Sequence, residues 1–211
     1  YFRELGQEVV LSEPTNRQTV ESAGLISEAE HCLPVKLLDA HIAELAGRVD
    51  CIFVPRLLSN LRRHVACAKL GALPDAAEAR LRKTGTRVLT VEIDVAHRPR
   101  DGSLTELGRS LGADPVRIAA AITAARQCMK ETTRGLGQPP AQDKRPVIFL
   151  VAHPYILYDD YFSGPIIRKL ESMQVGVRRL TFPEREVPPS FIRWDACNKM
   201  YQVLLQMPPR A

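Results

Sequence analysis

The stretch PVKLLDAHIAELAGRVDCIFVP, residues 34–55, places a helical pattern directly before an apolar strand. Proline suits the first turn of a helix, so we expect a helix that begins at about Pro34. Its apolar face consists of Leu38, Ile42 and Leu45, which recur at helical spacing. Residues 50–55 form a continuous apolar run, which is typical of a parallel strand buried on both faces. A helix beside a buried strand indicates an α/β fold.

The same alternation extends in both directions from this stretch. Pro74 is expected to open a further helix, and the pair Gly164-Pro165 to precede another. Apolar runs that predict further strands are residues 8–11, 88–94, 146–151 and 175–180. A last helix is expected at residues 194–205. We therefore predict an α/β fold with two Rossmann-like lobes, mostly parallel sheets and a cleft between the lobes.

Glycine and proline mark the boundary between the predicted lobes. Residues 132–145 contain several of both and form the best linker in the chain. The predicted division is a first Rossmann-like lobe at residues 1–100, a helical connector and linker at 101–145, and a second Rossmann-like lobe at 146–211. Residues 1–6 have the pattern of a helix end closed by glycine, so we expect the first lobe to have a further strand before residue 1.

Composition narrows the classes of partner. The chain has 211 residues and a net charge of +5, but its Lys and Arg residues are scattered and few aromatic residues accompany them. This distribution predicts a solvated surface and no nucleic-acid partner. No apolar run reaches the roughly 20 residues that span a bilayer, so no membrane association is expected. Five cysteines without a CxxC pair favour reduced thiols and a cytoplasmic location.

Two cysteines lie at positions that suit a metal-binding or nucleophilic thiolate. Cys32 lies just before a predicted helix, where backbone N–H groups favour a thiolate, and Cys67 lies between His64 and Lys69. A thiolate binds iron or zinc, or attacks carbon. The alternatives are a small buried thiol that fills space at Cys32 and a surface thiol without a function at Cys67. Cys51, within an apolar strand, is expected to belong to the core.

Ligands of open α/β sheets bind outside the carboxyl ends of the strands. The side chains expected there, and therefore predicted to bind a ligand, are Thr15, Asn16 and Arg56 in the first lobe and His153 and Tyr155 in the second. The alternatives are that His153 forms a hydrogen bond within its own turn and that Tyr155 only packs against neighbouring side chains. The sequence has no GxGxxG after a strand, no GxxxxGK[ST], no GxSxG and no HExxH, which removes support for four common enzyme classes.

An ordered set of short motifs carries a family resemblance. They are FRELG (2–6), VVLSEPTN (9–16), CLPVK (32–36), VDCIFVPR (49–56), CAKLGALPD (67–75) and HPY (153–155). In this order they resemble the activase-related proteins of the 2-hydroxyacyl-CoA dehydratase system, often labelled CoA-substrate-specific enzyme activase-like. The resemblance covers most of the chain.

The resemblance implies an iron–sulfur protein. Cys32 and Cys67 match the two motif cysteines and would bind a [4Fe-4S] cluster. Electron transfer to a CoA thioester, or its dehydration, would be the activity, with a CoA thioester or related anionic ligand and a partner subunit or second copy as partners. The leading alternative is a metal-free binding or assembly module, because Pro55-Arg56 stands where longer relatives carry a third cysteine. A thiol-based transferase with Cys32 as nucleophile and His41 or His153 as base is a third hypothesis.

Overall fold

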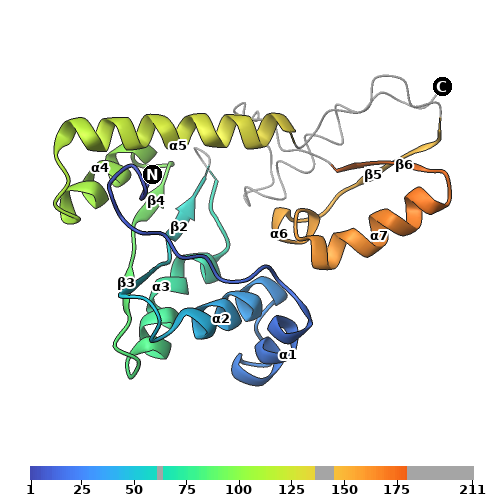
Figure 1. Ribbon diagram of the computed structural model, residues 1–211, viewed down its shortest axis with the longest axis horizontal. Coiled ribbons are helices and arrows are strands. Elements are labelled where there is room, and N and C mark those ends of the chain that lie inside the picture. The colour runs from blue at the N-terminus through green and yellow to red at the C-terminus, as the bar shows by residue number, and fades with distance from the viewer. Residues whose placement is uncertain (61–63, 136–144, 180–211) are drawn as a thin grey trace. The chain divides into compact units, whose positions relative to one another are not determined.

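The computed structural model describes residues 1–60, 64–135 and 145–179, and its chain divides into two compact units, Tyr1–Ala125 and Arg126–Ala211 (Figure 1). The division falls within the longest described helix. In chain order, the elements are α1 (Arg17–Ile26), α2 (Leu33–Leu45), β1 (Cys51–Phe53), β2 (Arg56–Ser59), α3 (Ala68–Leu81), β3 (Arg87–Leu89), β4 (Glu92–Asp94), α4 (Arg100–Ser110), α5 (Pro115–Gly135), β5 (Val147–Leu150), α6 (Pro154–Leu157), α7 (Asp160–Ser172) and β6 (Gly176–Arg179).

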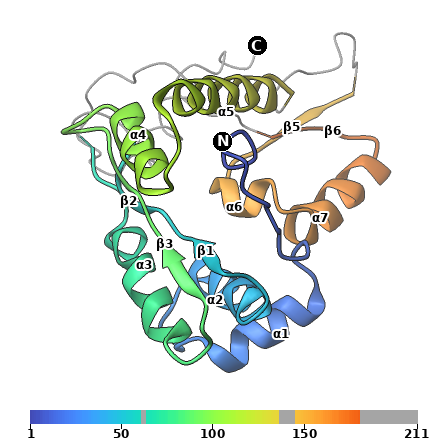
Figure 2. The ribbon, with the colours of Figure 1, turned by 60° about the vertical axis from the view of Figure 1, so that its left-hand side comes forward.

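All described strand pairs are parallel, which confirms the α/β class. Strand β1 pairs with β3, β2 with β4, and β5 with β6. Figure 2 shows β1 and β3 side by side. Hydrogen bonds from Val54 N to Leu89 O and from Arg56 N to Val91 O, both 2.9 Å, connect the first two pairs. The predicted strand at residues 88–94 is divided into β3 and β4.

The core of the first unit lies between β1 and the helices α2 and α3. Its buried members are Ile42, Ile52, Val54, Ala77 and Leu81. The expectation that residues 50–55 are buried on both faces is wrong, because the helices cover only one face of β1. Cys51 is exposed rather than in the core, and Phe53 is 38% exposed with Phe2 packed edge-on against it at 4.9 Å.

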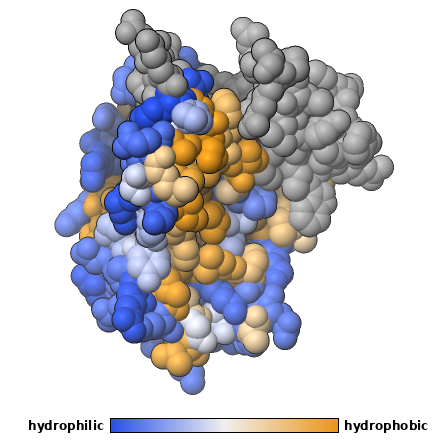
Figure 3. Space-filling model, turned by 90° about the vertical axis from the view of Figure 1, so that its right-hand side faces the viewer, coloured by the Kyte–Doolittle hydropathy of each residue, from blue (hydrophilic) through white to orange (hydrophobic). Residues whose placement is uncertain are grey.

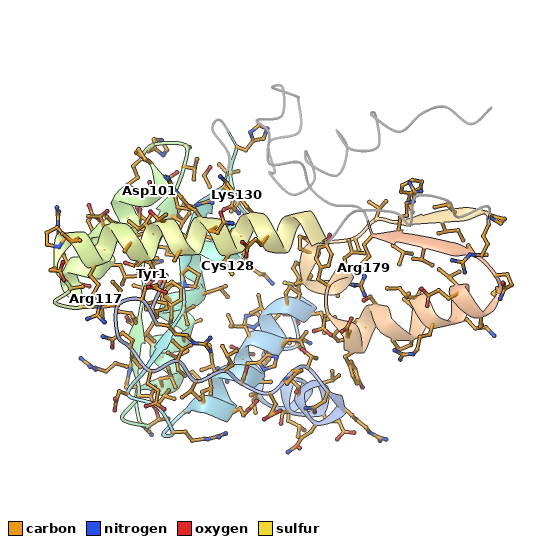
Figure 4. All side chains as sticks on the ribbon, turned by 45° about the horizontal axis from the view of Figure 1, so that its top comes forward. Tyr1, Asp101, Arg117, Cys128, Lys130 and Arg179 are labelled. Atoms are coloured by element: carbon orange, nitrogen blue, oxygen red, sulfur yellow. The ribbon has the colours of Figure 1, made fainter. Side chains whose placement is uncertain are left out.

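A second cluster anchors the amino-terminal residues on α5. Leu5 is buried against Ile118, Ala121 and Ile122. Arg117 Nε donates to the carbonyl oxygen of Glu4 at 2.8 Å, and Figure 4 shows Arg117 beside the amino-terminal segment. Gly6 closes the first turn with a positive φ of 79°, as its position predicts.

Three sequence-based expectations about element bounds are wrong. Residues 8–11 form no strand, and Leu11 is 77% exposed, because no neighbouring strand pairs with them. Helix α3 begins at Ala68, so Pro74 lies inside it. Helix α7 begins at Asp160, so Pro165 also lies inside a helix; Asp159 caps it by accepting a hydrogen bond from Tyr161 N at 2.9 Å.

The described part of the second unit contains the β5–β6 pair with α6 and α7. The predicted strands at 146–151 and 175–180 are confirmed as β5 and β6. The helix expected at residues 194–205 lies outside the described residues. In the described part of the chain, no helix is long and apolar enough to cross a membrane. The face in Figure 3 carries both strongly hydrophilic and strongly hydrophobic side chains.

Candidate functional site

Cys32 and Cys67 occupy equivalent positions in the first unit. Each is the N-cap residue of a helix, Cys32 for α2 and Cys67 for α3. Both have an extended backbone, with φ and ψ of −69° and 156° at Cys32 and −59° and 131° at Cys67. Neither thiol makes a capping hydrogen bond. Neither thiol is therefore used to close the first turn of its helix.

The local sequence explains why a helix starts after each thiol. Pro34 lies at the start of α2, and Val35 N and Lys36 N both donate to the carbonyl oxygen of Cys32, at 3.0 and 3.1 Å. In α3, Leu70 N donates to the carbonyl oxygen of Cys67 at 2.9 Å. The first turn of neither helix contains an acidic residue. The positive end of each helix dipole is therefore not offset by a nearby carboxylate.

A hydrogen bond joins the two helix starts. Lys69, two residues after Cys67, donates from Nζ to the carbonyl oxygen of Glu30, two residues before Cys32, at 3.0 Å. Further along the same helices, Arg80 of α3 forms an ion pair with Asp39 of α2 at 2.9 Å. The two thiols thus come from neighbouring helices, and the first turn of α3 is bonded to the segment that leads into α2.

A pocket of about 530 Å³ opens beside Cys67. Its wall is formed by β2, the start of α3 and the residues that follow β4. It is lined by Arg56, Leu57, Leu58, Ser59, His64, Val65, Ala66, Cys67, Ala68, Gly71, Ala72, Asp75, Asp94, Ala96 and His97. Small and apolar side chains make up more than half of this set, and the polar remainder includes two imidazoles. Such a lining suits an organic ligand with a few polar groups.

The pocket's Arg56 is held by Asp75. Arg56 donates two hydrogen bonds to the Asp75 carboxylate, at 2.6 and 2.8 Å, and a third to the carbonyl oxygen of Gly71 at 2.5 Å. The hydrogen bond to Asp75 raises the pKa of Arg56, and the same bond lowers the pKa of Asp75 below its ordinary value of 3.8. Asp75 holds the Arg56 guanidinium in place and balances its charge, so Arg56 is not an unpaired cation that would attract an anionic ligand.

Two histidines lie in the same pocket wall. His64 is buried, with 5% of its surface exposed. His97 is exposed, and its Nδ1 lies 2.7 Å from Oδ2 of Asp94, whose side chain is only 15% exposed. A carboxylate bound to Nδ1 orients the ring and leaves Nε2 to act on a ligand.

The structure brings together only some of the predicted site residues. Arg56 and Cys67 line one pocket, and Lys69 connects the start of α3 to the segment before Cys32. Thr15 and Asn16 lie at the start of α1 and do not line this pocket. Thr15 Oγ1 lies 3.4 Å from His41 Nε2, and Asn16 caps α1 by accepting from Thr19 N at 3.1 Å.

His153 and Tyr155 belong to the second unit. His153 is the N-cap residue of α6, and its ring stacks on Tyr155 with centroids 5.1 Å apart and planes 7° apart. Tyr155 is 43% exposed. This stack is an accessible aromatic surface, and its predicted role in ligand binding stays a prediction.

Sequence reasoning missed three polar residues of this region, Asp39, Asp75 and His97, and it favoured a helix cap over a ligand-binding role for Asp94. Asp75, Asp94 and His97 line the pocket beside Cys67, and Asp39 lies under the segment before Cys32. Asp94 ends a predicted strand, which is the usual place for a ligand-binding side chain. The contacts of Asp39 and Asp75 depend on side chains 12 or more positions away, and no local pattern signals them.

Residues 1–182 match the protein family described as CoA enzyme activase uncharacterised domain. The chain belongs to this family. No curated protein and no solved structure matches it. The membership confirms the resemblance to CoA enzyme activase-related proteins that the ordered motifs indicate.

In this CoA enzyme activase-related chain, the described residues do not provide a complete metal site. Within residues 1–60, 64–135 and 145–179, no three His, Cys, Asp or Glu side chains form a group that could hold a metal ion. A [4Fe-4S] cluster usually takes four thiolate ligands. Cys32 and Cys67 are thiols, which is the ligand type that such a cluster takes. The described residues alone therefore do not fit the whole cluster.

Proposed function

We propose that this chain is an iron–sulfur protein that acts on, or passes electrons toward, a CoA thioester. Cys32 and Cys67 are two ligands of a [4Fe-4S] cluster, and the remaining ligands come from outside the described residues, from a partner subunit or from a second copy. The observation that carries the proposal is the hydrogen bond from Lys69 to Glu30, which ties together the two helix starts that carry these thiols.

Each proposed cysteine ligand lies at the start of a helix. A thiolate is the form of cysteine that binds iron, and the N-terminal turn of a helix presents N–H groups and a positive dipole to it. Lys36 and Lys69 add positive charge to α2 and α3, and neither first turn contains an acidic residue. Hydrogen bonds from backbone N–H groups to the sulfurs would also tune the reduction potential of a bound cluster.

The pocket beside Cys67 is the proposed position of the acyl end of the ligand. Its small and apolar lining suits a short acyl chain, and its imidazoles can interact with a carbonyl or hydroxyl oxygen. Arg56 contributes by shaping the wall together with Asp75. Thr15, Asn16, His153 and Tyr155 lie elsewhere, and their assignment to the ligand remains a sequence-based prediction.

A second function, a metal-free binding or assembly module, is favoured by one observation. No group of three metal-binding side chains occurs in the part of the chain that the structure describes. The pocket beside Cys67 would then bind an organic ligand without redox chemistry, and the paired first turns of α2 and α3 would serve stability alone.

Anaerobic cluster reconstitution separates the two functions. The wild-type chain and four single variants, Cys32→Ala, Cys67→Ala, Cys51→Ala and Cys128→Ala, are assayed for bound iron and sulfide and for a visible spectrum. Cys51 and Cys128 are exposed thiols outside the proposed site, so they are matched controls. The proposal expects cluster loss in the first two variants and a normal cluster in the controls. An iron-free wild type would establish the metal-free alternative. Equal loss in all four variants would contradict the assignment of Cys32 and Cys67 as the specific ligands.

A further inference from the structure

A buried carboxylate lies beneath the segment that carries Cys32. Asp39, on α2, is 4% exposed. Burying a charge is unfavourable unless partners compensate it, so the contacts of this side chain require an explanation. Its Oδ2 accepts a hydrogen bond from Ser27 Oγ at 2.5 Å and lies 2.9 Å from the Arg80 guanidinium. Ser27 is the C-cap residue of α1, and Arg80 lies near the end of α3.

The third partner is the residue directly before Cys32. His31 Nδ1 lies 3.2 Å from Ser27 Oγ and 3.7 Å from Asp39 Oδ2. A serine hydroxyl has one proton, and at 2.5 Å that proton is donated to Asp39. Ser27 Oγ can therefore only accept from His31, which places a proton on Nδ1 of the imidazole. The ring is oriented through Ser27 by the buried carboxylate.

Arg80 extends the same network to the end of α1. Besides its ion pair with Asp39, its guanidinium donates to the carbonyl oxygen of Ile26 at 3.0 Å. Arg80 and Lys69 both lie on α3, so this helix holds the segment of residues 26–31 at two places. One contact is at Ile26 and the other at Glu30.

We propose that Asp39 is a positioning residue that fixes Cys32 relative to Cys67. It joins the end of α1, the turn before Cys32 and the helix that begins after Cys67, while touching neither sulfur. The functional meaning of that spacing rests on the proposed role of the two thiols as ligands of one cluster. The spacing itself does not depend on any metal.

The loss of the Asp39 charge has a defined structural consequence. Asp39→Asn keeps the size of the side chain, but it leaves Arg80 without its charged partner and replaces one acceptor oxygen by a donor group. Ser27 and His31 then lose a fixed orientation. The segment before Cys32 is expected to sample several positions over α3, whereas β1 and the core beneath it are unaffected.

Paired spin labels test the proposal directly. In a chain with Cys51, Cys128 and Cys197 replaced by alanine, nitroxides on Cys32 and Cys67 report their distance distribution. We expect one narrow distance with Asp39 and loss of that narrow distribution in Asp39→Asn. Arg17→Ala is the control substitution, because it removes an ion pair to Glu21 at 2.7 Å on the exposed surface of α1. It should leave the distribution unchanged.

A second label pair separates positioning from general loosening. Labels on Cys51 and Cys67, with Cys32 replaced, connect β1 and α3 without the segment that Asp39 holds. Their distribution should stay narrow in Asp39→Asn. Equal broadening of both pairs would overturn the positioning role, as would an unchanged Cys32–Cys67 distribution in the folded variant. Ser27→Ala and Arg80→Lys provide the same test if Asp39→Asn does not fold, and each should broaden only the Cys32–Cys67 pair.

The labelled protein contains no metal, so its result is independent of the cluster assay. If Cys32→Ala retains its iron, the proposed function fails while the spin distances still report on Asp39. If the distances do not depend on Asp39 and Cys32→Ala loses its iron, the cluster proposal stands and the positioning role fails.

Discussion

Lys69 Nζ and the carbonyl oxygen of Glu30 are 3.0 Å apart, in a hydrogen bond between residues that are 39 positions apart in the sequence. Each partner lies two residues from a cysteine that begins a helix. This contact therefore connects the segment before Cys32 to the first turn of the helix that Cys67 begins. It makes the geometry of the two thiols dependent on a side chain at the surface.

Replacing Lys69 by Gln should weaken this connection at a small cost in stability. Exposed charge-assisted contacts contribute about 0.5 kcal/mol, so the free energy of unfolding in urea should fall by about that amount. Reconstituted iron should be lost to a chelator faster than from the wild type. Lys69→Arg, which keeps a charged donor, is the control. Identical iron-release rates in all three proteins would contradict the importance of this contact for the site.

The Arg56–Asp75 pair should make the pocket wall sensitive to acid. Asp75 has a pKa below 3.8 in the folded chain, because Arg56 donates to it, so the folded state binds its proton less tightly than the unfolded state. Its contribution to stability is complete above 3.8 and is lost as the pH falls through the lowered pKa. Urea unfolding of wild type and Asp75→Asn from neutral pH downward should show a difference that shrinks only in this acidic range. A stability difference that grows as the pH falls through this range would contradict the prediction.

Gly108 should not tolerate a methyl group. A Cβ at this buried position would lie 2.6 Å from Cγ1 of Ile118 and 3.1 Å from the Tyr1 hydroxyl, so α4 and α5 would have to move apart. Gly108→Ala should destabilise the chain by about 1–3 kcal/mol. Gly102→Ala in the same helix meets nothing within 4 Å and should be neutral or stabilising by up to about 1 kcal/mol. Thermal unfolding of the two variants checks the contrast, which similar melting temperatures would refute.

Tyr158 should lose its phenolic proton at a higher pH than an ordinary tyrosine, because its pKa is raised. Burial raises its pKa above the ordinary 10.0, an effect partly offset by the charge of Arg179. The folded state then holds the phenolic proton more tightly than the unfolded state, so the contribution to stability is complete below 10.0 and is lost as the pH rises through the raised pKa. The ultraviolet absorbance change of the wild type should contain a component above 10.0 that is missing in Tyr158→Phe. If the component that Tyr158→Phe removes is centred below pH 10.0, burial does not raise the pKa of Tyr158.

Local patterns account for much of the first unit. The helix that becomes α2 is predictable because its apolar residues recur at helical spacing and Pro34 lies at its start. Short apolar runs, which are typical of buried strands, likewise predict β5 and β6. Periodicity failed where tertiary contacts decide the outcome. Residues 8–11 have the composition of a strand, but within the described residues no strand pairs with them, and only one face of β1 is covered by helices.

The candidate site was predictable only in part. A cysteine before a proline-initiated helix indicates an N-cap thiol, and the structure places Cys32 there. The sequence places a helix start at Pro74, so it does not predict that Cys67 begins a helix. The partners of Arg56 and Asp39 could not be predicted, since they are brought together by the packing of β2 on α3 and of α1 and α3 on α2.

Pro74 inside α3 changes the backbone hydrogen bonds of that helix. Pro74 has no N–H, so the carbonyl one turn earlier loses its intrahelical donor and the ladder of that turn is disturbed. At the same turn, the carbonyl of Gly71 accepts a hydrogen bond from Arg56 of β2. The carbonyl that lacks its donor is that of Leu70, next to the Gly71 carbonyl that joins α3 to β2. A residue with an N–H at position 74 would therefore complete the helical ladder at Leu70, and the joint to β2 through Arg56 would remain.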